Sequence, residues 1–244
     1  MVGKIAHDVP VKGLSGATTL ALTTAAGSSV ANIYYAQPLL DLMAQDLGIS
    51  AATIGMIVMV TQIGYGLGLI FIVPLSDLVD RRKLIVAQGL LLAIALLIVA
   101  AAGARTMLLL GMTAVGLLAV LVQVLVAQAA ALATPTQRGK VVGTVTSGVV
   151  TGILAARSVA GIVADIGGWR AVYLASAFVT LVMVGILMSV LPRRSQERGS
   201  ETYIRALIST PGLFLRERML LSRGAIALLI FASFATFWTG QIGR

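Results

Sequence analysis

The chain contains no cysteine and only one histidine, His7, among its 244 residues. Without cysteine it forms neither a disulfide nor a thiolate metal site, and one histidine does not supply the set of ligands that a metal ion needs. Charge is also scarce, because 11% of the residues are charged against about 25% in ordinary soluble domains. Hydrophobic residues make up 58% of the chain and its mean hydropathy is +0.99. The sequence therefore predicts an integral membrane protein, without a metal site, in a lipid bilayer.

Catalytic motifs are missing as well. We find no grouping of Ser, His and Asp, no paired carboxylates within an apolar run, no HExxH motif and no phosphate-binding loop. The sequence therefore predicts that the protein is not an enzyme, and nothing in it indicates a cofactor.

Long apolar runs fill most of the sequence. Crossing a hydrocarbon core about 30 Å thick takes about 20 mostly apolar residues. Six segments meet this requirement: residues 14–39, 54–73, 84–103, 107–132, 141–164 and 171–191. We expect Pro38 to end the first of them. A seventh apolar segment, residues 224–239, runs almost to the end of the sequence.

These segments predict an all-α membrane protein with three parts. A six-helix transmembrane bundle occupies residues 1–191, a polar and basic cytoplasmic linker residues 192–223, and the start of a second half residues 224–244. We expect the chain to be one half of a larger protein, either a truncated product or a natural half.

Basic residues alternate between the loops. Fourteen Lys and Arg residues fall in the N-terminal stretch, the second and fourth loops and the linker, whereas the other loops hold only Arg105 and Arg170. The positive-inside rule places the basic loops and the N-terminus in the cytoplasm. The net charge of +9 is therefore interpreted as a topology signal, and nucleic acid is not expected as a partner.

Polar side chains inside membrane spans are costly and often functional. Five of them are predicted to line a cavity for a small-molecule substrate: Asn32, Tyr35, Gln62, Gln123 and Arg157. Gln62 shares a helix face with Tyr65. The alternatives are hydrogen bonds within the helix, helix packing and, for Arg157, a side chain that extends to the outer membrane surface.

The stretch PLSDLVDRRKLI between the second and third apolar segments resembles the signature loop of the major facilitator superfamily, G-x-L-a-D-R-x-G-R-R. Five residues match the signature: Leu75, Ser76, Asp77, Arg81 and Arg82. Three positions depart from it: Val73, Leu78 and Asp80. PTQRGKVVG and GGWRAVY are similar to the family's loop before the fifth helix and to the start of its sixth.

The resemblance implies twelve helices in two halves, each built from two inverted three-helix repeats. This chain would be the N-terminal half. The signature loop is most similar to that of bacterial drug:proton antiporters, which implies a secondary transporter in the cell inner membrane that exports a small molecule by alternating access. Protons are then a candidate coupling ion. The fifth segment lacks the Gly-Pro of the antiporter pattern, and the first and fourth contain no Asp or Glu.

In the family, the Asp of the signature, here Asp77, caps the third helix or pairs across to the other half. A gating role is therefore implied for Asp77, with Arg81 and Arg82, although these two arginines equally serve as topology anchors. The missing C-terminal half, in cis or from a second chain, would close the cavity. The alternative function is that of a non-transporting six-helix remnant or scaffold that needs a second half or self-association.

Overall fold

The computed structural model describes residues 14–192 and, beyond them, residues 203, 219, 221–222, 224–226, 229–230 and 232–233, with the backbone alone at residues 51–52. Seven helices follow one another over residues 14–192: α1 (Gly16–Tyr34), α2 (Ala36–Leu47), α3 (Ala51–Leu75), α4 (Arg81–Ala100), α5 (Arg105–Ala119), α6 (Leu121–Leu132) and α7 (Arg138–Val190). The described residues contain no strand, which confirms the predicted all-helical class. Most of the predicted linker and of the seventh apolar segment lies outside the described residues.

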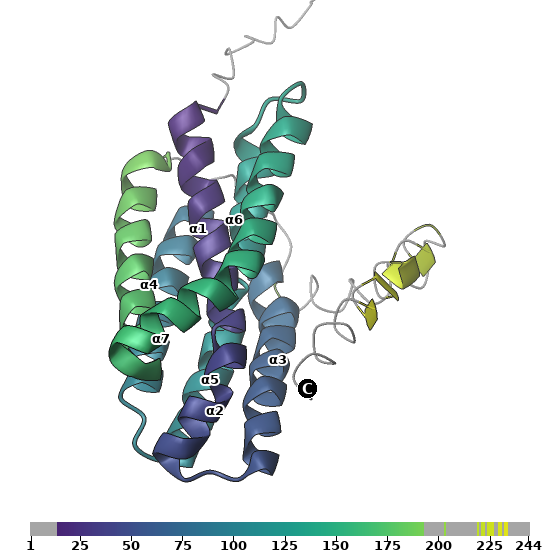
Figure 1. Cartoon of the computed structure of the whole chain (residues 1–244). Coiled ribbons are helices and arrows are strands. Elements are labelled where there is room, and N and C mark those ends of the chain that lie inside the picture. The colour runs from purple at the N-terminus through teal and green to yellow at the C-terminus, as the bar shows by residue number, and fades with distance from the viewer. Residues whose placement is uncertain are drawn as a thin grey trace, which may run out of the picture.

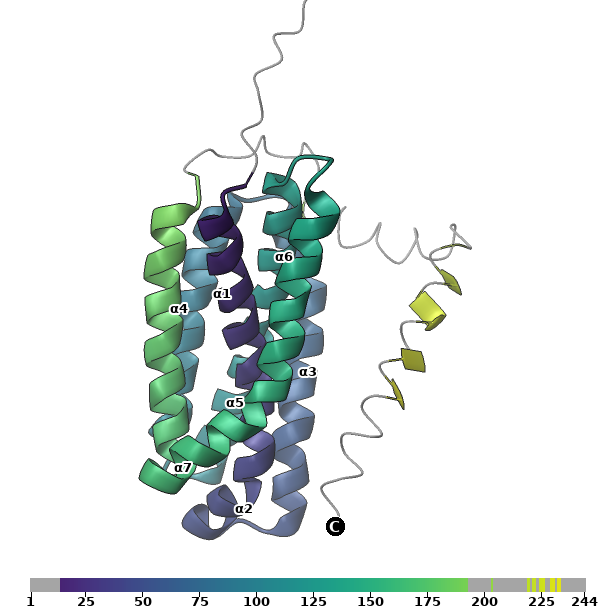
Figure 2. The same ribbon diagram turned by 45° about the horizontal axis from the view of Figure 1, so that its top comes forward.

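The helices run up and down beside one another (Figures 1 and 2). α2 continues from α1 and α6 from α5, with one residue between them in each case. α7 folds back on itself at Gly168, whose φ of 73° and ψ of 176° fall in a region that glycine alone adopts readily. Its two limbs therefore run in opposite directions along the bundle, as both views show.

Four helices of the described part are long and apolar enough to cross a membrane: Thr53–Leu75, Arg81–Ala100, Arg105–Leu132 and Arg138–Val190. Large apolar side chains also face outward, among them Leu110, Ile162 and Ile166. A protein in lipid keeps such side chains on its outside, since the hydrocarbon solvates them. The helices are therefore those of a multi-pass membrane protein, as predicted.

The first predicted segment departs from expectation at Pro38. The helix does not end there, because α1 stops at Tyr34 and α2 carries the chain on to Leu47. Proline has no N–H to donate to the carbonyl four residues earlier and its ring clashes with that carbonyl, so the interruption falls near Tyr34. Pro38 then occupies the first turn of α2, where an N–H would have no helical partner.

Two helix pairs meet backbone to backbone through glycine. Between α1 and the first limb of α7, an added Cβ on Gly27 would lie 2.6 Å from the carbonyl oxygen of Gly148, and one on Gly152 would clash with the carbonyl of Gly27. Between α3 and α5, a Cβ on Gly116 would clash with the carbonyl of Thr61. Small residues allow this approach in membrane helices, and these contacts fix how the two pairs pack.

Candidate functional site

The signature loop, the stretch PLSDLVDRRKLI of residues 74–85, contains the end of α3, a connection at residues 76–80 and the start of α4. Asp80 is the N-cap of α4, since its carboxylate accepts hydrogen bonds from the backbone N–H groups of Arg82 at 2.9 Å and Lys83 at 3.2 Å. The implied cap role of Asp77 is therefore wrong. α4 begins at Arg81, and an N-cap directly precedes the first helical residue. Asp77 lies too early in the loop to reach those N–H groups.

Asp77 is instead paired within the loop. Its carboxylate accepts a hydrogen bond from Nη2 of Arg81 at 2.6 Å. The Asp77 side chain stays 68% exposed, whereas that of Arg81 is only 14% exposed. Only the carboxylate side of this ion pair faces solvent, and that exposure screens the attraction towards the range of surface pairs, about 0–1 kcal/mol. Asp77 is thus held at the surface, in a contact that costs little to exchange.

The two arginines of the signature attach the loop to other helices. Nε of Arg81 donates to the carbonyl of Ser76 at 3.0 Å, and its Nη1 reaches the carbonyl of Ala127 in α6 at 3.4 Å. Nη2 of Arg82 donates to the carbonyl of Met188 at 2.5 Å, in the last turn of α7. A cation near a helix C-terminus is favourable, because the free carbonyls there carry partial negative charge. The loop is therefore anchored to α6 and α7.

A polar pair joins α3 and α6. Nε2 of Gln123 donates to the hydroxyl of Tyr65 at 3.2 Å, and Gln123 is exposed. Gln62 lies one turn before Tyr65 on α3 and is exposed too. The structure thus brings Gln123 together with Tyr65. The sequence had indicated Tyr65 only because it shares a helix face with Gln62. Tyr35 lies elsewhere, half-buried at the junction of α1 and α2.

Asn32 and Arg157 have different surroundings. Asn32 is fully buried, and its Oδ1 accepts a hydrogen bond from the hydroxyl of Ser176 in the second limb of α7. Asn32 thus lies at a helix contact, and its role in a cavity stays a prediction. Arg157 lies on the first limb of α7, where it is half-buried and interacts with other groups of the protein.

The opposite end of the bundle holds a cluster that the sequence did not indicate. Trp169 Nε1 donates to Asp46 at 3.2 Å, and Arg170 donates to the same carboxylate oxygen. Arg170 also donates to the carbonyl of Ala102 at 2.9 Å, and its guanidinium lies 4.4 Å from the centre of the Trp169 ring. The hydrogen bond from Arg170, followed by that from Trp169, lowers the pKa of Asp46 below its ordinary value. Arg170 therefore joins the ends of three segments.

Comparison with known proteins places this geometry in a family. The model of the Major Facilitator Superfamily matches residues 21–242. The uncharacterised transporter YgaY of Escherichia coli is 42% identical over 235 residues, which cover 95% of this chain and 59% of YgaY. SCO4007 of Streptomyces coelicolor, named "Probable transporter", is 37% identical, over 93% of this chain and 54% of its own length. Both relatives are named as transporters, and the chain spans little more than half of their length.

A solved structure shows the same fold. The inward-facing, occupied form of a bacterial homologue of the human lysosomal transporter Spinster superimposes with a TM-score of 0.61, at 18% identity, over 74% of this chain and 44% of that protein. Since the family model matches nearly the whole sequence, the chain belongs to the major facilitator superfamily.

Proposed function

We propose that the chain forms the N-terminal part of a secondary transporter that exports a small molecule by alternating access. Family membership and two relatives named as transporters support this function rather than an enzyme's. The observation on which the proposal chiefly depends is the pair of Tyr65 and Gln123. At this pair, α3 and α6 meet through polar side chains. Such side chains are unfavourable in contact with lipid, whereas a substrate would form hydrogen bonds with them.

The proposed transporter part crosses the membrane six times, which the helix lengths support. α1 with α2 forms the first, α3 the second, α4 the third, and α5 with α6 the fourth. A straight α7 of 53 residues would be about 80 Å long, far more than a hydrocarbon core of about 30 Å. The reversal at Gly168 divides it into the fifth and sixth crossings.

The described charges support the predicted orientation in a cell inner membrane. The end of the bundle that holds the signature loop carries five basic residues: Arg81, Arg82, Lys83, Arg138 and Lys140. The opposite end carries Arg105 and Arg170 together with three acidic residues. The positive-inside rule then makes the first end cytoplasmic. α1 begins at that end (Figure 2), so the N-terminus is proposed to be cytoplasmic.

The glycine contacts support two inverted three-helix repeats. In two such repeats, the first crossing corresponds to the fourth and the second to the fifth. A contact between the first and fifth crossings therefore has its equivalent in a contact between the fourth and second. These are the α1–α7 and α3–α5 pairs. Both have a glycine against a backbone carbonyl, with Gly152 on Gly27 and Gly116 on Thr61, as two copies of one packing unit would.

We assign the substrate cavity to the polar residues of the first, second, fourth and fifth crossings. Gln62 and Gln123 supply amide donors and acceptors, while Tyr35 supplies a hydroxyl; Arg157 adds a positive charge for an anionic group of the substrate. Asn32 would reach the cavity only after a shift of the α1–α7 contact. The first and fourth predicted segments contain no Asp or Glu. Coupling to protons would therefore use a titrating group elsewhere in the transporter.

Gating is proposed for the signature loop. Arg81 and Arg82 hold the loop on α6 and α7, while Asp77 keeps most of its side chain exposed. A C-terminal half, in cis or from a second chain, could offer Asp77 a new donor in one state of the transport cycle. A ligand or contact shifts an equilibrium only if it differs between the two states, and a contact of Asp77 with the other half in one state alone would meet that requirement.

The test is transport by the protein of the whole reading frame, which sequencing beyond codon 244 would define. A growth-inhibition panel would select a toxic compound, and flux of that compound would be measured in proteoliposomes. Tyr65→Phe and Gln123→Leu are expected to lower export several-fold. Ser189→Ala is the control, since its hydroxyl donates to Ile186 within its own helix. If no compound of the panel crosses the membrane, the protein is better explained as a scaffold.

A further inference from the structure

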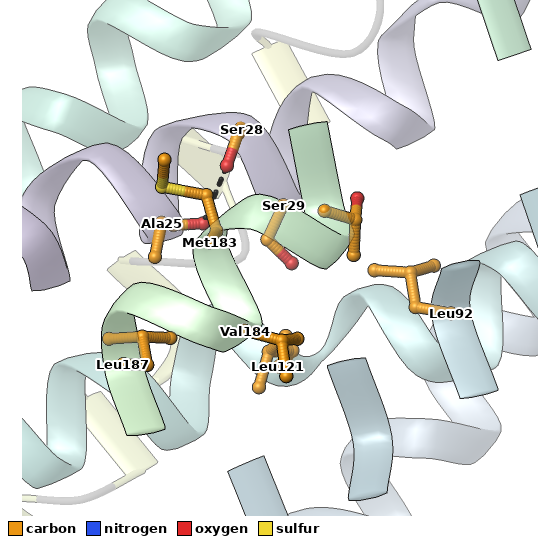
Figure 3. A pocket seen from close by; sticks show the side chains of 9 residues that line it. Ala25, Ser28, Ser29, Leu92, Leu121, Met183, Val184 and Leu187 are labelled. Atoms are coloured by element: carbon orange, nitrogen blue, oxygen red, sulfur yellow. Dashed lines mark hydrogen bonds between the residues drawn. The ribbon is translucent and has the colours of Figure 1, made fainter. Parts of the chain in front are cut away.

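A narrow pocket lies among α1, α4, α6 and α7 (Figure 3). Most of its lining is apolar, with Leu92, Leu121 and Leu187 among the residues. Three lining residues carry hydroxyl groups: Ser28, Ser29 and Thr180. The space within it is about that of one water molecule. The pocket therefore combines an apolar wall with a small polar side.

The hydroxyl groups of this pocket differ in their partners. Ser28 donates to the carbonyl of Ala25 in its own helix at 3.1 Å, the dashed line in Figure 3. Ser29 is 4% exposed, and its Oγ has no hydrogen-bond partner among the described residues. Thr180 is also buried. A buried hydroxyl that lacks a partner is unfavourable, so native proteins nearly always satisfy such groups with protein or water.

The same contact contains further polar groups. Asn32 lies three residues after Ser29 on α1, and its partner Ser176 lies four residues before Thr180 on α7. The two α1 residues and the two α7 residues therefore lie on the sides of these helices that face each other. Nδ2 of Asn32 also lacks a partner within the described part of the chain. So does Oε1 of Gln88, one turn before the pocket residue Leu92 on α4.

We propose that the pocket is a binding site for one water molecule, which bridges the hydroxyl groups of Ser29 on α1 and Thr180 on α7. Water fits because it both donates and accepts, as the two hydroxyl groups do. A metal cation fits poorly, since none of the pocket's lining residues is acidic and an uncompensated charge in apolar surroundings is far more costly than a neutral molecule. The bridge joins the first crossing to the sixth within this half of the transporter.

The sign of a stability change distinguishes a hydrated pocket from a dry one. Ser29→Ala and Thr180→Val each remove one hydroxyl while nearly keeping the side-chain volume. If water bridges the pair, each variant leaves a polar partner unsatisfied, and the melting temperature of the purified protein in detergent falls by about 2–4 °C. The double variant leaves neither hydroxyl unsatisfied, so its melting temperature falls no further than that of either single variant. In a dry pocket Ser29→Ala removes a buried hydroxyl that lacks a partner, so the melting temperature of that variant rises or stays the same.

Ser28→Ala is the matched control, since its hydroxyl is already satisfied within α1. Wild-type melting temperatures in sodium and choline buffers of equal ionic strength are expected to agree. A stabilisation that requires sodium and is lost in Thr180→Val would overturn the water in favour of a cation. If the variants do not fold, a high-resolution experimental map of the wild type decides. Density for one water within about 2.5–3.0 Å of both hydroxyl groups is expected, and an empty pocket would refute the proposal.

Discussion

The carboxylate of Asp46, at the end of α2, accepts a hydrogen bond from the guanidinium of Arg170, at the start of the second limb of α7. Arg170 holds the carbonyl of Ala102 with its other nitrogen. One side chain thereby fixes α2, the α4–α5 connection and the bend of α7. The contact therefore holds together the end of the bundle that lies away from the signature loop.

Asp46→Asn tests this contact through its pH dependence. The pKa of Asp46 is lower in the folded protein than its ordinary value of 3.8, so the charged carboxylate stabilises the fold above that value. The contribution is lost as the pH falls through the folded pKa. We expect Asp46→Asn to melt below the wild type at neutral pH, with the difference shrinking below pH 3.8. Melting curves measure both. Asp41→Asn, an exposed carboxylate on the same helix, should track the wild type; a constant difference would contradict the assignment.

The helices that are long and apolar enough to cross a membrane could be predicted because apolar length is a local property of the sequence. The interval between residues 164 and 171, where two predicted segments met, contains the reversal at Gly168. The residues at which helices begin and end were harder to predict from the sequence. The N-cap of α4 is Asp80 rather than Asp77, because the identity of the cap depends on the single residue at which the helix begins.

The polar pairs could not be predicted for a different reason. Tyr65 and Gln123 are 58 residues apart, and Asp46 and Arg170 are 124 apart. Nothing local relates such residues until the helices pack. Helical spacing identified Gln62 and Tyr65 as sharing a face, but which helix faces them depends on the glycine contact between α3 and α5.

Gly152→Ala tests the close approach of α1 and α7. The added Cβ would clash with the carbonyl of Gly27, and backbone cannot rotate away as a side chain can. Overpacking costs about 1–3 kcal/mol, and each kcal/mol lowers the melting temperature by about 2–4 °C in a chain of this size. Gly161→Ala on the same helix is the control, because its Cβ would meet nothing within 4 Å. That variant should equal or exceed the wild type, since alanine favours a helix by about 1 kcal/mol. Equal melting temperatures for both variants would refute the packing.

Gly168→Ala tests the reversal of α7. With φ at 73° and ψ at 176°, a residue with a side chain is strained by about 1–3 kcal/mol. We expect the variant to melt several degrees lower, or to yield little folded protein when expressed as a fusion with a fluorescent reporter and analysed by size-exclusion chromatography. Gly103→Ala lies at the same end of the bundle with open space around its Cβ and should behave as the wild type. A normal Gly168→Ala profile would show that α7 does not turn there.

Substitutions of Asp77 and Asp80 distinguish a gating role from helix capping, because these two acidic residues of one loop have different partners. Asp80→Ala removes the acceptor for two backbone N–H groups of α4 and should cost about 1 kcal/mol, a loss that melting curves resolve. Asp77→Asn leaves that cap and both carbonyl contacts of Arg81 in place, so its melting temperature should stay close to the wild type. In the transporter of the whole reading frame, Asp77→Asn should nevertheless lower flux several-fold, since the neutral amide weakens an exchangeable ion pair with either half. Unchanged flux with Asp77→Asn would leave the loop only its structural role in joining α4, α6 and α7.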